Sequence, residues 1–301
     1  MSELGGLWVT TVAPYDSSGN VDSETVASHV AAMYRAGVRR FVPGGNTGEY
    51  FSLEPSEILA QVAAARQAAP EAIVYCGVGG ALAAAIALAE AAIAQGADGV
   101  MIHDPIHPHL SHAGLEEYYR KIASAVEGRA MLYKRSHRVP DDLVLRLVKD
   151  ESVNGVKYGV NDLVAFATAR AAAPESFWIC GTAELWAPFF HLLGADGFTS
   201  GLANAMPTLA VAVEQALSEQ DIARSMALRE LAVPFELLRA EDDAAKNVPA
   251  VRSAMSLAGF DVGPPRAPLT PLEPPDVARV EKIWATWQEA GVATPEPEAL
   301  V

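Results

Sequence analysis

Short apolar runs alternate with amphipathic segments along most of the chain. The runs that favour β-strands are rich in Val, Ile, Phe and Tyr, and they occupy residues 7–15, 39–45, 72–79, 99–105, 129–135, 153–160, 177–183 and 197–202. Between and after them, apolar residues recur with helical spacing, over residues 22–36, 54–68, 81–95, 111–126, 140–149, 161–173, 184–193 and 207–217. The alternation predicts eight consecutive β-α units.

Eight such units predict a closed (β/α)8 TIM barrel, in which a helix follows each of the parallel strands. A doubly wound open sheet would show the same alternation and is the alternative. Further helical patterns follow at residues 219–237, 241–258 and 274–290, with a proline-rich stretch at 262–275. We therefore expect a barrel over residues 1–218 that carries the active site, and a C-terminal helical domain over residues 219–301.

Composition predicts a globular protein with an anionic surface. Of the 301 residues, 50% are hydrophobic, and the formal net charge is -15 at pH 7. This charge repels phosphate backbones, so we do not expect nucleic acid as a partner. Residues 1–11 lack the features of a signal peptide, and the longest apolar run, 81–96, contains Glu90 and is too short to span a bilayer. We expect a cytoplasmic protein with no membrane partner.

One charged residue, Lys157, interrupts the sixth strand-like run, VNGVKYGV. Burial disfavours an ammonium ion, so a lysine at the mouth of a barrel has a lowered pKa and can form a Schiff base with a carbonyl. The alternative is a strand-end lysine whose amine reaches solvent. Lys134 lies at a strand end beside Arg135, and the remaining lysines lie in helical patterns, namely Lys121, Lys149, Lys246 and Lys282.

Two other features have chemistry that suits such a lysine. In the stretch GGNTGEYFSLEPSE, glycines surround Asn46 and Thr47, so the backbone of this turn could hold a small carboxylate. A plain strand-to-helix turn, with Ser52 starting the helix and Pro55 in its first turn, would use similar residues. Tyr133, near the end of the fifth run, could relay a proton, or it could be a core tyrosine with a satisfied hydroxyl.

The order and spacing of these features resemble the N-acetylneuraminate lyase and dihydrodipicolinate synthase family of class I aldolases. The segments that carry the resemblance are APYDSSGNVD, GNTGEYFSL, Tyr133, GVKYGVND, GADGFTSGLAN and PPRAPLTPL. The resemblance implies a TIM barrel with a C-terminal helical domain, a homotetramer, and no cofactor. It also implies a lysine imine with pyruvate or another 2-oxo acid as substrate.

Carried over residue by residue, the resemblance makes Lys157 the imine-forming lysine and Tyr133 the proton relay. The carboxylate site and the segment lining the pyruvyl end are then made of Asn46, Thr47, Gly48, Thr199 and Ser200.

Departures from the family pattern concern the second half of the substrate. Asn46 stands where the synthase has the first of two adjacent threonines, and His107 lies in the loop that lends a tyrosine to the neighbouring subunit. Arg138 has the spacing of the arginine that binds the second substrate's carboxylate, although Arg135 could compete for that role. Because TGEYFSL is close to the TGEFFSL of 5-dehydro-4-deoxyglucarate dehydratases, we expect a sugar-acid substrate. Dihydrodipicolinate synthase itself is the alternative.

Two other classes of function remain to be compared with this one. The histidines of HDPIHPHLSH could bind a divalent metal ion, as in a class II aldolase, although Pro105 and Pro108 prevent a regular helical ligand face. We expect no metal. A barrel that has lost catalysis could serve as a sensor or scaffold, but such a chain would have partly lost Lys157, Tyr133 and the GNTGE turn. All three are present.

Overall fold

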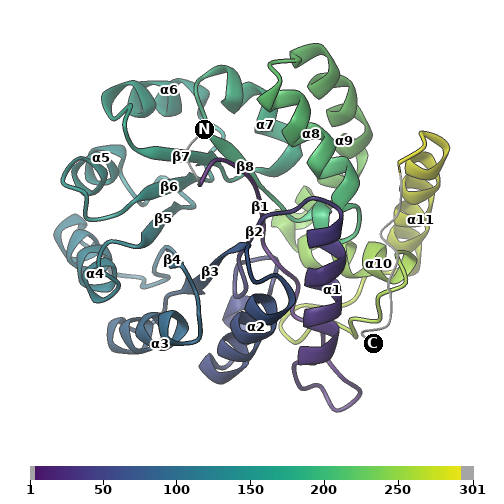
Figure 1. The fold of residues 1–301 in the computed structure, drawn as a ribbon, viewed down its shortest axis with the longest axis horizontal. Helices are drawn as coiled ribbons and strands as arrows, with labels where there is room; N and C mark the ends of the chain where they lie inside the picture. The colour runs from purple at the N-terminus through teal and green to yellow at the C-terminus, as the bar shows by residue number, and fades with distance from the viewer. Residues whose placement is uncertain (1–3, 293–301) are drawn as a thin grey trace.

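A computed structural model describes residues 4–292 and shows a closed barrel of parallel strands in the order β1 to β8, ringed by helices (Figure 1). The barrel prediction is therefore confirmed, and the open sheet is excluded. The strands are β1 Gly6–Val9, β2 Arg40–Phe41, β3 Ile73–Val78, β4 Gly99–Ile102, β5 Ala130–Lys134, β6 Gly155–Tyr158, β7 Phe177–Cys180 and β8 Gly197–Ser200.

Each strand is followed by a helix that covers the outside of the barrel. These helices are α1 Ser23–Arg35, α2 Pro55–Ala68, α3 Leu82–Ala94, α4 His112–Ala125, α5 Asp141–Lys149, α6 Leu163–Ala172, α7 Ala183–Leu192 and α8 Pro207–Ser218. Short 3-10 helices, η1 Tyr50–Ser52 and η2 Leu202–Asn204, precede α2 and α8. The α2 helix begins at Pro55 with Glu54 as its cap, so Ser52 does not start it.

The predicted strand-like runs are longer than the strands, mainly at their C-terminal ends. The first run was predicted to reach residue 15, whereas β1 ends at Val9, where its pairing with β8 and β2 ends. Residues beyond that point keep their apolar character because they are buried in the loops at the mouth of the barrel. A buried apolar run therefore extends further along the chain than the paired strand within it.

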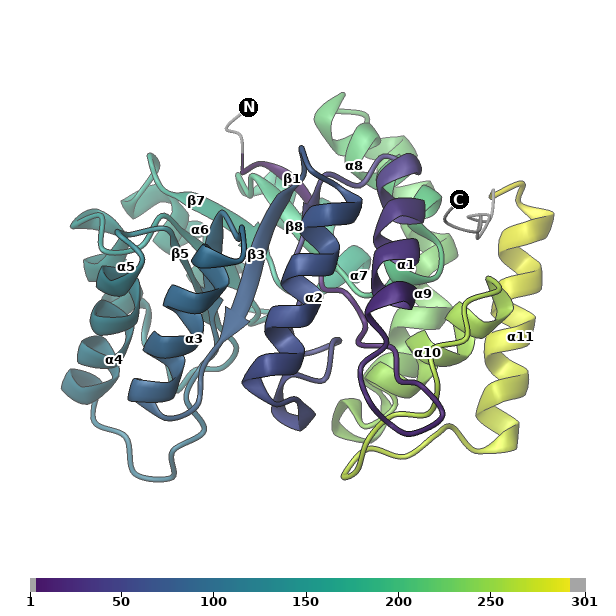
Figure 2. The ribbon, with the colours of Figure 1, turned by 60° about the horizontal axis from the view of Figure 1, so that its bottom comes forward.

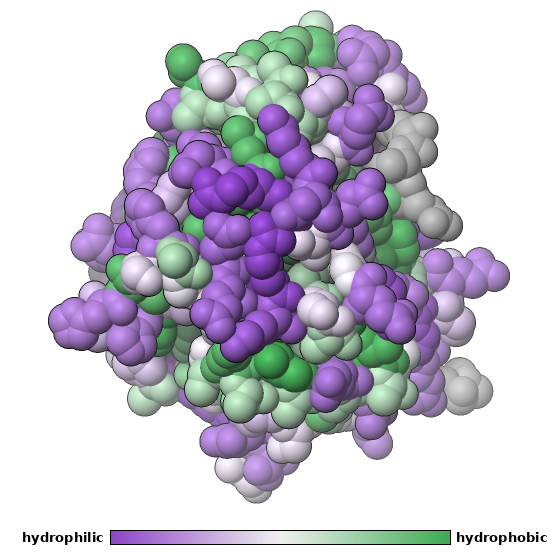
Figure 3. All heavy atoms as spheres, turned by 90° about the vertical axis from the view of Figure 1, so that its left-hand side faces the viewer, coloured by the Kyte–Doolittle hydropathy of each residue, from purple (hydrophilic) through white to green (hydrophobic). Residues whose placement is uncertain are grey.

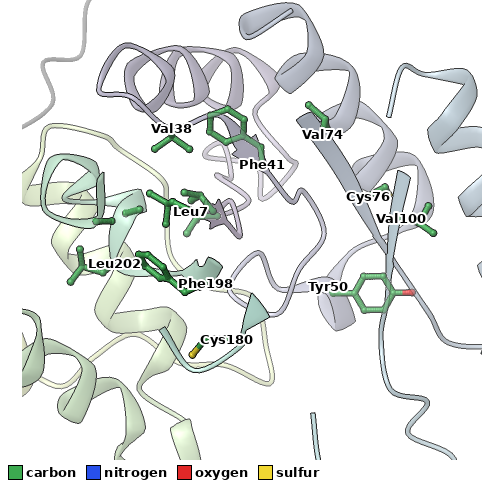
Figure 4. Close-up of a cluster of buried hydrophobic side chains, with 14 of the residues drawn as sticks. Leu7, Val38, Phe41, Tyr50, Val74, Cys76, Val100, Cys180, Phe198 and Leu202 are labelled. Carbon is green, nitrogen blue, oxygen red and sulfur yellow. The ribbon is translucent and has the colours of Figure 1, made fainter. Parts of the chain in front are cut away.

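Alternation along the strands separates an interior core from an outer one. The interior of the barrel is filled by Trp8, Val42, Tyr75, Met101, Met131, Tyr133, Phe177 and Ile179. The other strand face packs against the helices, and Figure 4 shows part of that outer cluster, including Leu7, Phe41 and Phe198. Inward and outward positions alternate as a pleated strand requires, so the position of a residue in its strand decides which core it joins.

Three helices follow the barrel: α9 Ile222–Ala244, α10 Asn247–Leu257 and α11 Pro274–Glu289. They pack against one another beside α7 and α8 (Figure 2). The sequence predicted a break between residues 237 and 241, but α9 continues through Arg239 and the backbone becomes non-helical at Glu241–Asp243. Residues 293–301 of the predicted C-terminal domain lie outside the described residues.

The surface is largely polar on the side of the barrel opposite these three helices. Figure 3 shows hydrophilic residues across the centre of this face, with patches of apolar residues above and below them. Within residues 4–292, no helix combines the length and apolar character needed to cross a bilayer.

Candidate active site

Lys157 lies in β6 and points into the barrel. Its neighbours in the sheet are Tyr133 and Ile179, which both belong to the interior core. The amine lies 4.3 Å from the centre of the Tyr133 ring, and it has no ion-pair partner in the described part of the chain. Burial, aided by the positive charges of Arg239 and Arg135, lowers the pKa of Lys157 to about 8. A fraction of this amine is therefore uncharged near neutral pH, as nucleophilic attack requires.

A second lysine, Lys134, lies at the end of β5, as expected, but it is also buried, which the sequence pattern did not indicate. It directly follows the inward-pointing Tyr133, so its side chain points outward, toward α5. There its amine donates to the Val139 carbonyl and lies 3.3 Å from the Asp141 carboxylate. Of these two buried lysines, Lys134 is therefore held by an acid and only Lys157 has an unpaired amine.

Tyr133 has room beside Lys157 because residue 159 is a glycine. A Cβ at Gly159 would lie 2.8 Å from Cε2 of the Tyr133 ring. Burial raises the pKa of Tyr133, whereas the charge of Arg135 and the nearby Asn46 side chain act in the opposite direction. The phenol therefore stays protonated at neutral pH, as the predicted proton relay requires.

The turn after β2 offers two backbone donors for a carboxylate. Asn46 and Thr47 line the cavity that contains Lys157, and their N–H groups donate to no other backbone group of the described residues. Gly48 does not line the cavity, but a Cβ there would lie 2.4 Å from the Thr11 carbonyl oxygen, so glycine allows the turn to pack this closely. Consecutive free N–H groups form a concave site suited to a small anion.

Glu49 holds this turn from behind. Its backbone adopts the left-handed conformation, with φ of 58°, and its carboxylate is buried. Arg252 of α10 donates from Nε to Glu49 Oε1 at 2.7 Å, while the Tyr15 hydroxyl and the Arg266 N–H donate to Oε2 at 3.3 and 3.0 Å. Residues of α10 and of the segment before α11 thus contact a turn of the barrel.

Lys157, Tyr133 and the Asn46–Thr47 turn surround one cavity of about 250 Å³. Thr199 and Ser200, at the end of β8, also line it; Thr199 Oγ1 donates to the Cys180 carbonyl at 3.4 Å, and Ser200 Oγ accepts from the Ala203 N–H at 2.8 Å. From the predicted set, the cavity brings together Asn46, Thr47, Tyr133, Lys157, Thr199 and Ser200.

Besides Gly48, two predicted residues lie outside this cavity, His107 and Arg138. Both are exposed, and Arg138 Nη2 donates to the His107 carbonyl at 2.5 Å. Arg135, the alternative to Arg138, is also exposed and does not line the cavity, although its charge acts on Lys157. A substrate contact for any of these three residues therefore stays a prediction.

The four histidines around the loop after β4 do not converge. His103 is buried, its Nε2 lies 2.9 Å from the Gly44 carbonyl oxygen, and its ring centre lies 4.3 Å from that of Tyr50. Burial is the main reason that the pKa of His103 falls to about 4. The exposed members are His107, His109 and His112. Across residues 4–292, no three His, Cys, Asp or Glu side chains are grouped as metal ligands.

Three polar residues that sequence reasoning missed form another part of the cavity lining: Glu236 and Arg239 of α9, and Asn247 of α10. Arg239 donates through Nη1 to Glu236, and through Nε and Nη2 to Asn247 Oδ1 at 3.2 and 2.8 Å. The non-helical residues Glu241–Asp243 turn the chain so that Asn247 returns to Arg239. We call Glu236, Arg239 and Asn247 the far wall.

Glu184, in the first turn of α7, is a buried neighbour of the far wall. Within the described residues, neither of its carboxyl oxygens has a hydrogen-bond partner. Burial, together with the negative charge of Glu236, raises the pKa of Glu184 to about 8. At neutral pH, Arg239 therefore has its ion-pair partner Glu236 and one largely protonated acid, Glu184, beside it.

A model of the Dihydrodipicolinate synthetase family matches residues 3–286. The chain belongs to the dihydrodipicolinate synthetase family. Family membership supports an aldolase-type lyase that acts on a 2-oxo acid, and it agrees with the resemblance on which the site prediction was based.

Similar proteins cover almost the whole chain. A protein of Halobacterium salinarum named "Uncharacterized DapA-like lyase" is 32% identical, over 92% of each chain. A protein of Pseudarthrobacter chlorophenolicus named "Probable 5-dehydro-4-deoxyglucarate dehydratase" is 30% identical, over 93% of this chain and 94% of that one. The solved dihydrodipicolinate synthase of Bacillus clausii is 35% identical, with a TM-score of 0.90, over 94% of this chain and 97% of that one.

Proposed function

We propose that this protein is a lyase that acts on 2-oxo-3-deoxy sugar acids through an imine on Lys157. The observation on which the proposal rests is the buried, unpaired Lys157 amine beside Tyr133, in a cavity that also contains the Asn46–Thr47 turn. Membership of the dihydrodipicolinate synthetase family supports it, as does the similarity to a protein named for a sugar-acid dehydratase activity.

In the proposed reaction, the substrate carboxylate binds the N–H groups of Asn46 and Thr47, and the adjacent ketone then lies beside Lys157. The neutral amine attacks the ketone carbon, and Tyr133 protonates the new hydroxyl so that it leaves as water. The cationic imine is an electron sink at C2. It permits either loss of a C3 proton followed by the C4 hydroxyl, or cleavage of the C3–C4 bond, and both outcomes are lyase reactions.

The polarity of the cavity favours a hydroxylated substrate over aspartate semialdehyde. Asn46 replaces a relay hydroxyl of the synthase, and its Oδ1 is buried without a hydrogen-bond partner in the described structure. An acceptor of this kind suits a substrate hydroxyl, and a site built around such bonds discriminates strongly against analogues that lack them. The synthase activity is the second candidate, because the solved synthase of Bacillus clausii is similar over nearly the whole chain.

A side-by-side assay separates these candidates. Purified protein is given pyruvate with aspartate semialdehyde in one series, and 2-oxo-3-deoxy aldonates and 5-dehydro-4-deoxyglucarate in another. The proposal expects the higher kcat/KM for a sugar acid, and loss of that activity in Lys157→Met. A higher value for the semialdehyde condensation would instead make the protein a synthase, and no turnover in either series would favour the inactive scaffold.

The homotetramer and the cytoplasmic location also belong to the proposal, since both are implied by the family resemblance or by the sequence. Sedimentation velocity tests the assembly, and a single species with the mass of one chain would contradict it.

A further inference from the structure

The cavity continues from Lys157 toward the C-terminal helices. The carboxylate turn and Lys157 come from the barrel, whereas Glu236, Arg239 and Asn247 come from α9 and α10. A 2-oxo acid with its carboxylate at the turn and its ketone at Lys157 therefore has its remaining carbons available to the far wall. These residues meet the part of the substrate in which sugar acids differ.

The only cation of the far wall already has an acid as its partner. Arg239 donates to Glu236 through Nη1, and Asn247 Oδ1 accepts from its Nε and Nη2. Both members of the Glu236–Arg239 ion pair are buried, with 7% and 6% of each residue exposed. The Arg239 guanidinium also packs closely against Gly201, since a Cβ at Gly201 would lie 2.1 Å from Arg239 Nη2.

Because of this pairing, the cavity lining has no cation available for a second carboxylate. Besides Tyr133, the ionisable side chains that line the cavity are the cations Lys157 and Arg239 and the acid Glu236. The first substrate carboxylate is matched by the Lys157 ammonium or imine cation, and Arg239 is matched by Glu236. A second carboxylate would have no cation left, and it would lie near Glu236 in a buried site where like charges repel strongly.

Neutral hydroxyls are better suited to the far wall. The guanidinium retains N–H groups beyond those bonded to Glu236 and Asn247, and the Glu236 carboxylate and the Asn247 amide supply acceptors and donors. A hydroxyl both donates and accepts, so vicinal hydroxyls can bond to such a pair without adding charge.

We propose that the Glu236–Arg239 pair is a specificity determinant that selects a neutral, hydroxylated end of the substrate over a carboxylate. On the proposed function, on which this inference rests, the preferred substrate class is the 2-oxo-3-deoxy aldonates rather than diacids such as 5-dehydro-4-deoxyglucarate. The chain would then differ in substrate from the relatives that carry the dehydratase name.

The test compares two 2-oxo-3-deoxy acids of equal length and equal C4 and C5 configuration, one ending in a hydroxymethyl group and the other in a carboxylate. We expect wild-type protein to prefer the hydroxymethyl acid by about 10²-fold in kcat/KM. Glu236→Gln removes the negative charge and keeps the side-chain size, so it should reduce this preference by about tenfold or more. Glu230→Gln is the matched control on the same helix, because its side chain is 65% exposed; the preference should not change.

Equal rates, or a preference for the diacid in wild-type protein, would overturn the inference whatever the variants do. Borohydride reduction of each mixture reports separately on the proposed function. If neither acid forms an adduct on Lys157, the Schiff-base lyase is wrong; if both form the adduct but the diacid reacts faster, only the specificity assignment is wrong.

Discussion

Arg252 lies outside the cavity, yet we expect it to control substrate binding. Its guanidinium donates to Glu49, directly behind the Asn46–Thr47 turn, and to the carbonyl oxygens of Ala13 and Val262. Replacing it by methionine keeps the apolar stem and removes all of these bonds. The Glu49 carboxylate then stays buried and loses its only cationic side-chain partner in the described structure.

The size of the effect follows from the burial of the pair. The side chains of Arg252 and Glu49 are 4% and 0% exposed, and removing one partner of such an ion pair costs about 3–5 kcal/mol. Because the Tyr15 hydroxyl and the Arg266 N–H still donate to Glu49, we expect the lower end, about 3 kcal/mol. A displaced turn should also raise KM for the 2-oxo acid by about tenfold, equivalent to about 1.4 kcal/mol of binding.

Urea unfolding and steady-state kinetics on Arg252→Met measure both quantities. The control is Arg224→Met, which removes an arginine that is 45% exposed and paired with Glu219; its unfolding free energy should change by less than about 1 kcal/mol. Adding Glu49→Gln to Arg252→Met should recover part of the lost stability, because no unpaired carboxylate remains. If Arg252→Met loses less than about 1 kcal/mol and keeps its KM, the turn does not depend on this ion pair.

Three further changes act on the ionisable groups of the site. Lys157→Met should be more stable than wild type by roughly 3 kcal/mol at pH 7, because the pKa of Lys157 is about 8 against an ordinary 10.5. This advantage should fade between pH 8 and 10.5, where Lys157 is protonated in the unfolded chain but not in the folded one. A pH-independent difference in unfolding free energy would contradict the burial argument. Tyr133→Phe should lower kcat by roughly 10²-fold with little change in thermal stability, and an unchanged kcat would make Tyr133 a core residue. Glu184→Gln should be more stable than wild type above pH 8 by about 3–5 kcal/mol, since the pKa of Glu184 is about 8 against 4.5 when unfolded. The difference should vanish below pH 4.5, and urea unfolding across this pH range measures it. A variant that is less stable than wild type above pH 8 would mean that Glu184 is ionised and stabilising.

The features that could be predicted from the sequence are those that depend on local patterns of residues. The barrel follows from alternating strand and helix periodicities, and the inward position of Lys157 follows from its apolar neighbours in one strand. Tyr133 and Lys157 come together because β5 and β6 pair in register, which a barrel with consecutive strands requires. The sequence pattern did not show that Lys134 is buried as well, because its outward position depends on which of two adjacent residues faces the interior.

The far wall could not be predicted because it depends on tertiary structure. Arg239 and Asn247 meet only because Asp242 and Asp243 adopt positive φ values and turn the chain between them. A weaker signal was present: Glu236 and Arg239 lie three residues apart on the same buried stripe of α9 as Phe235. Two opposite charges at this spacing on an apolar stripe indicate a buried ion pair, and a buried pair near a barrel mouth is a candidate site.

The most direct test of the central claim is the location of a covalent adduct. Protein is incubated with pyruvate or a 2-oxo-3-deoxy acid, reduced with borohydride, digested, and the modified peptide is sequenced by mass spectrometry. We predict a single adduct on Lys157, with none on Lys134, which is buried but paired with Asp141, and no adduct in Lys157→Arg. An adduct on a different lysine, or full turnover in Lys157→Arg without any adduct, would contradict a Schiff-base mechanism at Lys157.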